Sequence, residues 1–254
     1  MTYQYIQLNV HNGYADIILN RPAKYNALRL EMCEEIAHAV ETMAARSDIK
    51  AVIISGAGKN FCAGLDVGAD TGPSDTKGAW VTSRRMQGTF SRIADAPVVK
   101  ICKLDGYVVG AGLLLAAVCN LRYATPETIF YVPELEMGIP YSLGGVACIA
   151  RYIGITRTTE LVLTCNKITA ESHYMDDFVT RVLQSNAIND FVEEIAHSLV
   201  ARPNALLLAS LTTIREAEKA LLPDAASDLF TMFYVGLEEE TKAVRERYSK
   251  RFKS

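Results

Sequence analysis

The chain has little of what a nucleic-acid-binding, membrane-spanning or secreted protein needs. Its 26 Lys and Arg residues are outnumbered by 29 Asp and Glu residues, so the net charge is -3 and no basic excess attracts phosphates. The longest apolar stretch, residues 108–118, is far below the roughly 20 residues of a membrane span. Residues 1–10 alternate like a strand and lack the charged start and apolar run of a secretion signal. We therefore expect a cytoplasmic protein that binds neither nucleic acid nor membranes.

Paired cysteines and metal-binding patterns are also missing. The six cysteines are scattered through apolar stretches without a Cys-x-x-Cys motif, which is typical of reduced thiols in a protein core. The four histidines show no spacing that would bring them to a common metal ion. We therefore expect neither disulfides nor a metal site.

Hydrophobic residues are abundant, at 50% of the 254 residues, which is enough to fill one large α/β core. The segments 3–10 and 14–20 alternate around an Asn-Gly dipeptide and predict a β-hairpin. Helical spacing of apolar residues predicts a helix over 30–45. The continuous apolar runs 51–55 and 98–104 predict strands that are buried on both faces. The first half of the chain therefore alternates between strand and helix.

The C-terminal part of the chain has a different pattern. It predicts helices only, over 188–200, 203–221 and 224–247, the second of them with proline at its start. We therefore expect two parts, an α/β core with the functional site over residues 1–186 and a helical region over residues 187–254.

Two glycine-bearing turns each follow a predicted buried strand, at 56–66 and 105–112. Their small residues let backbone amides approach a ligand closely. The second turn leads into a predicted apolar helix over 113–119, whose first N–H groups have no partner within the helix. Two such amides that converge on one point would form an oxyanion hole. Taken alone, each turn is equally well explained as a tight connection between a strand and a helix.

Four sequence blocks occur in one order along the chain. They are 19–28 (LNRPAKYNAL), 61–66 (FCAGLD), 106–112 (GYVVGAG) and 133–140 (PELEMGIP). In this order and spacing, the blocks resemble those of the enoyl-CoA hydratase/isomerase (crotonase) superfamily. The resemblance implies a spiral of ββα units with a C-terminal helical region that drives assembly of a trimer or hexamer. It also implies a site for an acyl-CoA thioester substrate.

The resemblance implies roles for individual residues. The backbone N–H groups of Leu65 and Ala111 match the oxyanion hole of the family, and Glu134 matches a glutamate that transfers protons. CoA is part of the substrate, so no separate cofactor is expected. The positions that match the CoA-binding segments are Lys24, Tyr25, Ala27, Ala63, Asp66 and Val67.

Asp66 allows a second interpretation, and three C-terminal residues are further candidates for CoA binding. Asp66 is more simply explained as a cap of the following helix. In the family, C-terminal residues of one subunit can contact CoA held by its neighbour, which makes Lys250, Phe252 and Lys253 weaker candidates.

Leu114 determines which reaction the resemblance favours. Many hydratases of the family divide water activation and proton transfer between two glutamates, one of which falls at Leu114 in this chain. A single carboxylate is enough to take a proton from C2 of a 3-enoyl thioester and return it at C4. The pattern therefore resembles that of 3,2-enoyl-CoA isomerases, with Glu134 as the proton shuttle.

The surroundings of Glu134 are expected to be apolar. It follows the run 129–133, and burial near Leu113, Leu114 and Tyr131 should raise the pKa of its carboxyl. Glu136 is the rival carboxylate, because an extended segment would point both side chains the same way.

Three tyrosines, Tyr107, Tyr131 and Tyr141, are expected as walls of the pocket. Three other functions remain open from the sequence: an enoyl-CoA hydratase, another crotonase-type lyase or hydrolase, and a non-catalytic acyl-CoA-binding protein.

Overall fold

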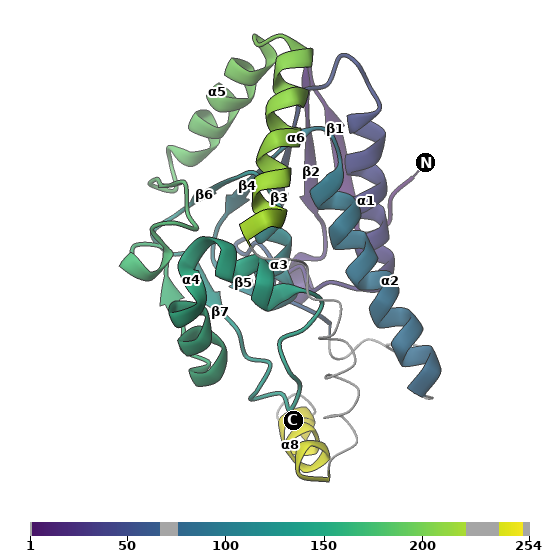
Figure 1. Ribbon diagram of the computed structural model, residues 1–254, viewed down its shortest axis with the longest axis vertical. Helices are drawn as coiled ribbons and strands as arrows, with labels where there is room; N and C mark the ends of the chain where they lie inside the picture. Colours follow the sequence, from purple (N-terminus) through teal and green to yellow (C-terminus); the bar gives the residue numbers. More distant parts are fainter. Residues whose placement is uncertain (1, 67–75, 222–238, 251–254) are drawn as a thin grey trace.

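A six-stranded sheet forms the centre of the molecule in the computed structural model, which describes residues 2–66, 76–221 and 239–250 (Figure 1). Its strand order is β1-β2-β3-β4-β6-β9. Only β1 and β2 pair antiparallel, and every later pair is parallel. The strands are β1 (Ile6–Val10), β2 (Tyr14–Leu19), β3 (Ala51–Gly56), β4 (Val99–Leu104), β6 (Leu121–Ala124) and β9 (Arg181–Val182). The predicted hairpin and both predicted buried strands are therefore confirmed.

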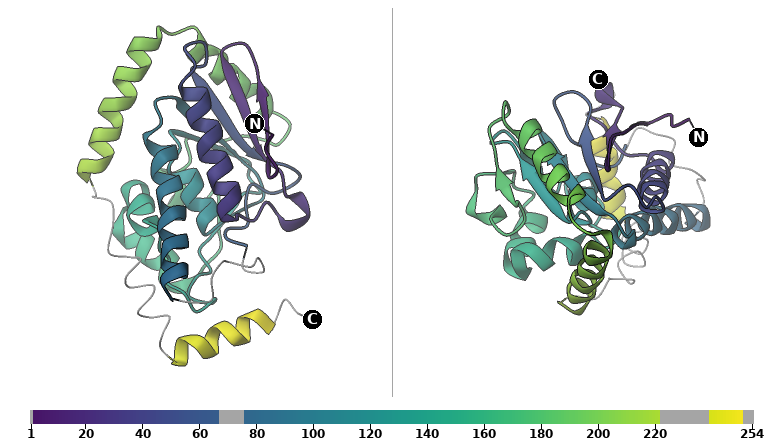
Figure 2. Two further views of the ribbon diagram at one scale, coloured as in Figure 1. Left: turned by 90° about the vertical axis from the view of Figure 1, so that its right-hand side faces the viewer. Right: turned by 90° about the horizontal axis from the view of Figure 1, so that it is seen from above.

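The central strands β3 and β4 are buried on both faces of the sheet, with successive side chains pointing to opposite sides. In β3, Val52 and Ile54 belong to the larger core cluster, whereas Ala51 and Ile53 belong to a second cluster on the other face. Helices α1 (Leu30–Ala44) and α2 (Thr76–Asp95) contribute to the larger cluster and lie side by side in Figure 2. The continuous apolar runs in the sequence therefore reflect strands covered on both faces.

The second face is covered by α5 (Ile188–Val200), which begins and ends where the sequence predicts. Its residues Ile188, Val192 and Ala196 share a cluster with side chains of β2, β3 and β4. Lys50 stabilises the end of this helix, because its Nζ donates a hydrogen bond to the carbonyl oxygen of Val200. The helical C-terminal region thus begins with a helix that completes the core.

Within the described residues, two further helices follow α5. The first, α6 (Asn204–Leu221), confirms the predicted helix at 203–221, and α8 spans Glu239–Lys250. The predicted helix over 224–247 is helical where the structure describes it, from 239 onward, and its earlier part lies outside the described residues. The division of the chain at residue 186 stays a prediction, as does assembly into a trimer.

A smaller sheet carries the loops of the candidate site. Its order is β5-β7-β8, with β5 parallel to β7 and β7 antiparallel to β8. The elements here are β5 (Tyr107–Val109), α3 (Ala111–Ala117), β7 (Ile129–Tyr131), α4 (Gly145–Thr164) and β8 (Ile168–Thr169), with short 3-10 helices at Pro22–Lys24 and His173–Met175. Helix α3 begins two residues before the predicted start at 113, directly after Gly110.

Candidate active site

The two glycine-bearing turns lie against each other. The N–H of Cys62 donates to the carbonyl oxygen of Tyr107 at 2.9 Å, and the N–H of Val109 donates to the carbonyl oxygen of Cys62 at 3.0 Å. Gly64 is needed at this approach, because a Cβ atom there would lie 2.9 Å from the carbonyl oxygen of Val109 and 3.7 Å from the backbone nitrogen of Ala111. The backbone that follows Gly64 therefore meets the beginning of α3.

The two backbone N–H groups that the sequence assigns to an oxyanion hole belong to Leu65 and Ala111. Within the described part of the chain, neither N–H donates to a protein acceptor. Gly110 has φ 49° and ψ −115°, a conformation that side-chain-bearing residues avoid. This glycine turns the chain from β5 into α3 and leaves the N–H of Ala111 outside the hydrogen bonding of the helix. Both side chains line one cavity.

Glu134 reaches the same place from the loop after β7. A Cβ atom on Gly110 would collide with Oε1 of Glu134, so glycine at this position makes room for the carboxylate at the start of α3. Oε2 is shielded from solvent and has no hydrogen-bond partner in the described residues. Burial raises the pKa of Glu134 from its usual 4.5 to about 7. A carboxylate in this state both accepts and releases protons near neutral pH.

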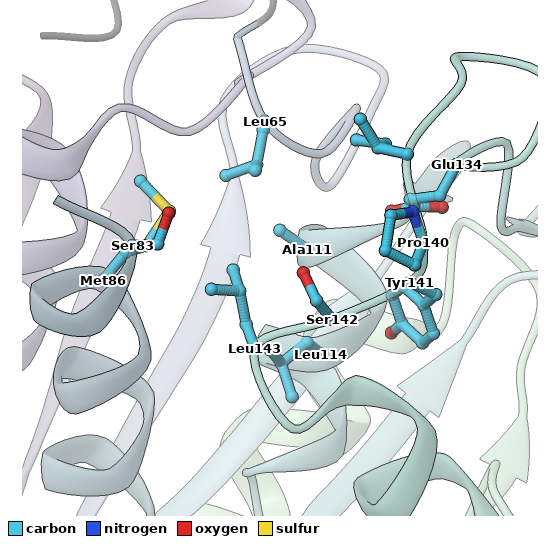
Figure 3. Close-up of a pocket in the computed structure, with 11 residues that line it drawn as sticks. Leu65, Ser83, Met86, Ala111, Leu114, Glu134, Pro140, Tyr141, Ser142 and Leu143 are labelled. Atoms are coloured by element: carbon cyan, nitrogen blue, oxygen red, sulfur yellow. The ribbon is translucent and has the colours of Figure 1, made fainter. Parts of the chain in front are cut away.

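The cavity around these groups has a volume of about 70 Å³, and Figure 3 shows the side chains at its wall. Ser83 and Met86 come from α2, and Leu114 comes from the first turn of α3. Among the described lining residues, only Glu134 carries a carboxylate. The lining consists of Leu65, Ser83, Met86, Ala111, Leu114, Glu134, Ile139, Pro140, Tyr141, Ser142 and Leu143.

The predicted alternative carboxylate, Glu136, does not join the site. The segment after Pro133 is a turn rather than an extended strand, because the N–H of Met137 donates to the carbonyl oxygen of Pro133 at 3.1 Å. Glu136 therefore points away and is exposed, and its Oε2 accepts a hydrogen bond of 2.7 Å from the hydroxyl of Tyr131. The condition under which Glu136 would point the same way as Glu134, an extended segment, is not met.

The predicted walls of the pocket are confirmed in part. Leu114 and Tyr141 line the cavity. Leu113 is fully buried in the core. The hydroxyl of Tyr131 donates a hydrogen bond to Glu136. Tyr107 is 36% exposed, and the ammonium group of Lys167 lies over its ring. The last three are absent from the described lining, so expecting them there was wrong.

Of the predicted CoA-binding segment, Lys24 and Tyr25 are exposed and Ala27 is buried. The N–H of Ala63 donates to the carbonyl oxygen of Tyr25 at 2.9 Å, so the two predicted CoA-binding segments lie side by side. Val67, Phe252 and Lys253 lie outside the described residues. Lys250, the other weaker candidate, is the last residue of α8 and is exposed.

Asn26 is a supporting residue that the sequence analysis missed. It is fully buried, its Nδ2 donates to the carbonyl oxygens of Ala57 and Asn60 at 2.9 and 2.8 Å, and its Oδ1 accepts from the N–H of Arg21. It therefore ties the first sequence block to the turn that leads to Leu65. Its position between Tyr25 and Ala27 in that block was the available signal.

Asp66 has a partner in the same block. Its Oδ2 accepts a hydrogen bond of 2.7 Å from Nη2 of Arg21, and both side chains are only 14% exposed. Residues 67–75, directly after Asp66, lie outside the described residues, so the predicted helix cap stays a prediction. The ion pair with Arg21 fixes the loop beside Leu65.

Other features of the chain concern disulfides, metals and membranes. All six cysteines are free thiols, and all but Cys148 are buried, as the sequence predicts. Within residues 2–66, 76–221 and 239–250, no three His, Cys, Asp or Glu side chains gather in a way that could hold a metal ion. No helix in these ranges is long and apolar enough to span a membrane.

The fold is that of crotonase-type proteins. A crystal structure of an enoyl-CoA hydratase/isomerase from Pseudoalteromonas atlantica T6c superposes with a TM-score of 0.85, at 19% identity, over 98% of this chain and 98% of that one. The sequence matches the enoyl-CoA hydratase/isomerase family over residues 9–251, and the chain belongs to this family. The resemblance found in the sequence is therefore confirmed, and the protein is an enzyme of a family whose members bind acyl-CoA thioesters.

Two curated relatives are named as isomerases. The chain is 27% identical over 230 residues to 1,2-epoxyphenylacetyl-CoA isomerase of Escherichia coli (strain K12), which covers 89% of this chain and 87% of the relative. It is 26% identical over 211 residues to the peroxisomal Delta(3,5)-Delta(2,4)-dienoyl-CoA isomerase of Arabidopsis thaliana, which covers 78% of this chain and 76% of the relative.

Proposed function

We propose that this enzyme moves the double bond of a 3-enoyl-CoA to give the 2-enoyl-CoA, with Glu134 as the single proton shuttle. The observation that carries the proposal is the lining of the cavity. Among the described lining residues Glu134 is the only carboxylate, and Leu114 lines the same cavity. The name of one curated relative, a dienoyl-CoA isomerase, fits a reaction that moves double bonds.

The reaction needs no group beyond the substrate and the protein. The thioester oxygen accepts hydrogen bonds from the N–H groups of Leu65 and Ala111, which stabilise the negative charge that forms when C2 loses a proton. Glu134 takes that proton, the double bond shifts from C3–C4 to C2–C3, and Glu134 returns the proton at C4. Atoms and charge balance without a cofactor. Each amide donor of such a hole typically lowers the barrier by about 3 kcal/mol.

The protonation behaviour of Glu134 suits this role. Burial raises the pKa of its carboxyl to about 7, so the charged base and the protonated acid are both populated near neutrality. Leu114 is 1% exposed and apolar, and it helps keep the carboxyl out of water. A water molecule between Leu114 and Glu134 would find no second carboxylate there to activate it.

The CoA portion is proposed to lie along Lys24, Tyr25 and Ala27 and the strand-like segment at Ala63. Lys24 is exposed and offers a positive charge to the phosphates of CoA. Assembly into a trimer or hexamer, as the family resemblance implies, remains part of this proposal.

The test compares wild type, Glu134→Gln and Glu136→Gln on 3-enoyl-CoA and 2-enoyl-CoA thioesters of several chain lengths, with products separated by chromatography and identified by mass. Glu136→Gln is the matched control, because this glutamate is exposed on the same turn. We expect Glu134→Gln to lower the isomerisation rate by at least about 100-fold, the lower range for loss of a general acid–base group. Glu136→Gln should keep the wild-type rate.

Three outcomes would contradict the proposal. Isomerisation by Glu134→Gln at the wild-type rate would remove Glu134 from the mechanism. Water addition to 2-enoyl-CoA as the main wild-type activity would identify a hydratase. Tight binding of CoA esters with no turnover of any of them would identify a non-catalytic binding protein.

A further inference from the structure

Tyr141 is a buried tyrosine beside the cavity whose hydroxyl has a defined partner. The residue is 6% exposed, and its hydroxyl donates to the carbonyl oxygen of Gly110 at 3.3 Å. The ring is fixed from the other side by the start of α4, where a Cβ atom on Gly145 would lie 2.6 Å from Cζ of the ring. The position of the hydroxyl is therefore set by packing, and Figure 3 shows the ring beneath Pro140 and Glu134.

The acceptor of this hydrogen bond belongs to a functionally placed peptide. The carbonyl of Gly110 and the N–H of Ala111 are the two ends of one planar peptide group. That N–H is one of the two proposed oxyanion donors. The carbonyl oxygen of Gly110 also accepts from the N–H of Leu114 at 3.1 Å, so two donors hold this oxygen in place.

We propose that Tyr141 is a positioning residue for the oxyanion hole, which it serves by holding and polarising the Gly110–Ala111 peptide. The inference rests on the proposed function, because it takes the N–H of Ala111 as a donor to the substrate thioester. A hydrogen bond to the carbonyl end of a peptide makes its N–H a stronger donor, since bonds in a chain polarise one another. The bond also fixes the unusual backbone angles of Gly110.

The alternative role for Tyr141 is a second acid beside Glu134. Burial and the nearby carboxyl of Glu134 raise the pKa of the Tyr141 hydroxyl well above its ordinary value. The hydroxyl therefore stays neutral through the working pH range and acts as a hydrogen-bond donor. Its recorded acceptor is the backbone carbonyl of Gly110 rather than the carboxylate.

The test compares Tyr141→Phe with Tyr152→Phe. Tyr152 is a matched control, because its hydroxyl donates at 3.2 Å to the carbonyl oxygen of Ala117, at the opposite end of α3. Each variant removes one hydroxyl that donates a hydrogen bond to a backbone carbonyl oxygen at one end of α3. The probe is butyryl-CoA with an isotopic label at the thioester carbonyl, an unreactive ligand whose infrared carbonyl band moves to lower frequency when the oxyanion hole polarises it.

In wild type and Tyr152→Phe, we expect the bound carbonyl band to move by the same amount. Tyr141→Phe should lose part of that movement, while the affinity for butyryl-CoA stays within about twofold. Its kcat should fall roughly fivefold, the equivalent of about 1 kcal/mol for one hydrogen bond. The midpoint of its pH–rate profile should match that of wild type, because the hydroxyl does not titrate in this range.

Each contrary result has a separate meaning. A Tyr141→Phe band equal to that of wild type, an equal loss in Tyr152→Phe, or a displaced pH midpoint would overturn the role of Tyr141. An unmoved wild-type band would overturn the oxyanion hole itself. A moved wild-type band without turnover of 3-enoyl-CoA would contradict the isomerase proposal alone.

A second variant covers the case in which Tyr141→Phe does not fold. Incorporation of 3-fluorotyrosine at position 141 keeps the ring and the hydroxyl and makes the hydroxyl a stronger donor. We expect the carbonyl band to move further than in wild type, and an unchanged band would contradict the inference.

Discussion

At the scale of single residues, the proposed choice between isomerisation and hydration depends on Leu114. Its side chain is 1% exposed and lines the same cavity as Glu134. A leucine here excludes water from the space where a second carboxylate would activate it. The absence of that carboxylate therefore favours transfer of a proton within the substrate over addition of water.

Replacing Leu114 by glutamate should introduce water addition. We expect Leu114→Glu to convert 2-enoyl-CoA to the 3-hydroxyacyl-CoA at least about tenfold faster than Leu114→Gln. The reason is that a carboxylate can act as a general base on water, whereas an amide cannot. The measurement is the amount of hydroxyacyl product by mass. Leu114→Gln has the same size and no charge, and so controls for the polar substitution. A folded Leu114→Glu variant with no hydration would mean that water cannot be positioned there.

The pH dependence should follow Glu134. Since its base form starts the reaction and its pKa is raised to about 7, kcat/KM should rise with pH and level off above that value. One pH unit below the midpoint, about one tenth of the plateau rate should remain, because about one tenth of the carboxyl is ionised. A profile already flat from pH 5 would contradict a buried base.

The same group links stability to pH with a definite sign. The pKa of Glu134 is higher in the folded protein than its ordinary 4.5, so the folded state binds the proton more tightly. Its favourable contribution is complete below about pH 4.5 and is lost as pH rises through about 7. Glu134→Gln removes the buried charge, and its melting temperature should therefore exceed that of wild type most clearly above pH 7.

At the scale of elements, α5 matters more to stability than to chemistry. It packs on the face of the sheet opposite to the cluster that contains Leu114, and Val192 at its centre is 1% exposed. Its end lies against the hairpin turn, where Gly13 leaves room for the side chain of Val200. Helix α5 therefore packs against the hairpin near the beginning of the chain.

Truncating Val192 should destabilise the protein without changing catalysis. Val192→Ala is expected to cost about 2 kcal/mol of unfolding free energy, between the values for smaller and larger aliphatic truncations. Glu194→Ala, on the exposed side of the same helix, should change it by less than about 0.5 kcal/mol. Denaturant unfolding and kcat of both variants provide the measurement. A large loss of kcat in folded Val192→Ala would show that α5 acts on the site.

The elements also show what the sequence could and could not predict. The strand at 51–56 follows from a continuous apolar run, and the helix at 188–200 follows from helical spacing of apolar residues. The two-residue strands β8 and β9 do not, because they exist only through pairing with distant strands. The orientation of Glu136 stayed open for a related reason: the turn after Pro133 is defined by backbone hydrogen bonds that apolar periodicity does not reveal.

At the scale of the whole molecule, the candidate site was predictable because its sequence blocks lie in a fixed order. The residues that hold the site in place were not predictable in this way. Glu134, Leu65 and Ala111 could be named from motifs, and all three line one cavity. Asn26, Arg21 and Tyr141 act by reaching across the fold to backbone atoms or to Asp66. Apart from the position of Asn26 within the first sequence block, a single sequence carries no signal for these long-range contacts.

The position of α5 also has a consequence for how the protein is made. Strands β2, β3 and β4 leave the ribosome long before residues 188–200, which cover one face of the sheet they form. Until those residues emerge, the side chains of Ala51, Ile53 and Ile101 on that face have no covering layer. Nascent chains that stop short of α5 therefore present an apolar sheet surface to chaperones, and this part of the core is complete only after residues 188–200 have been made.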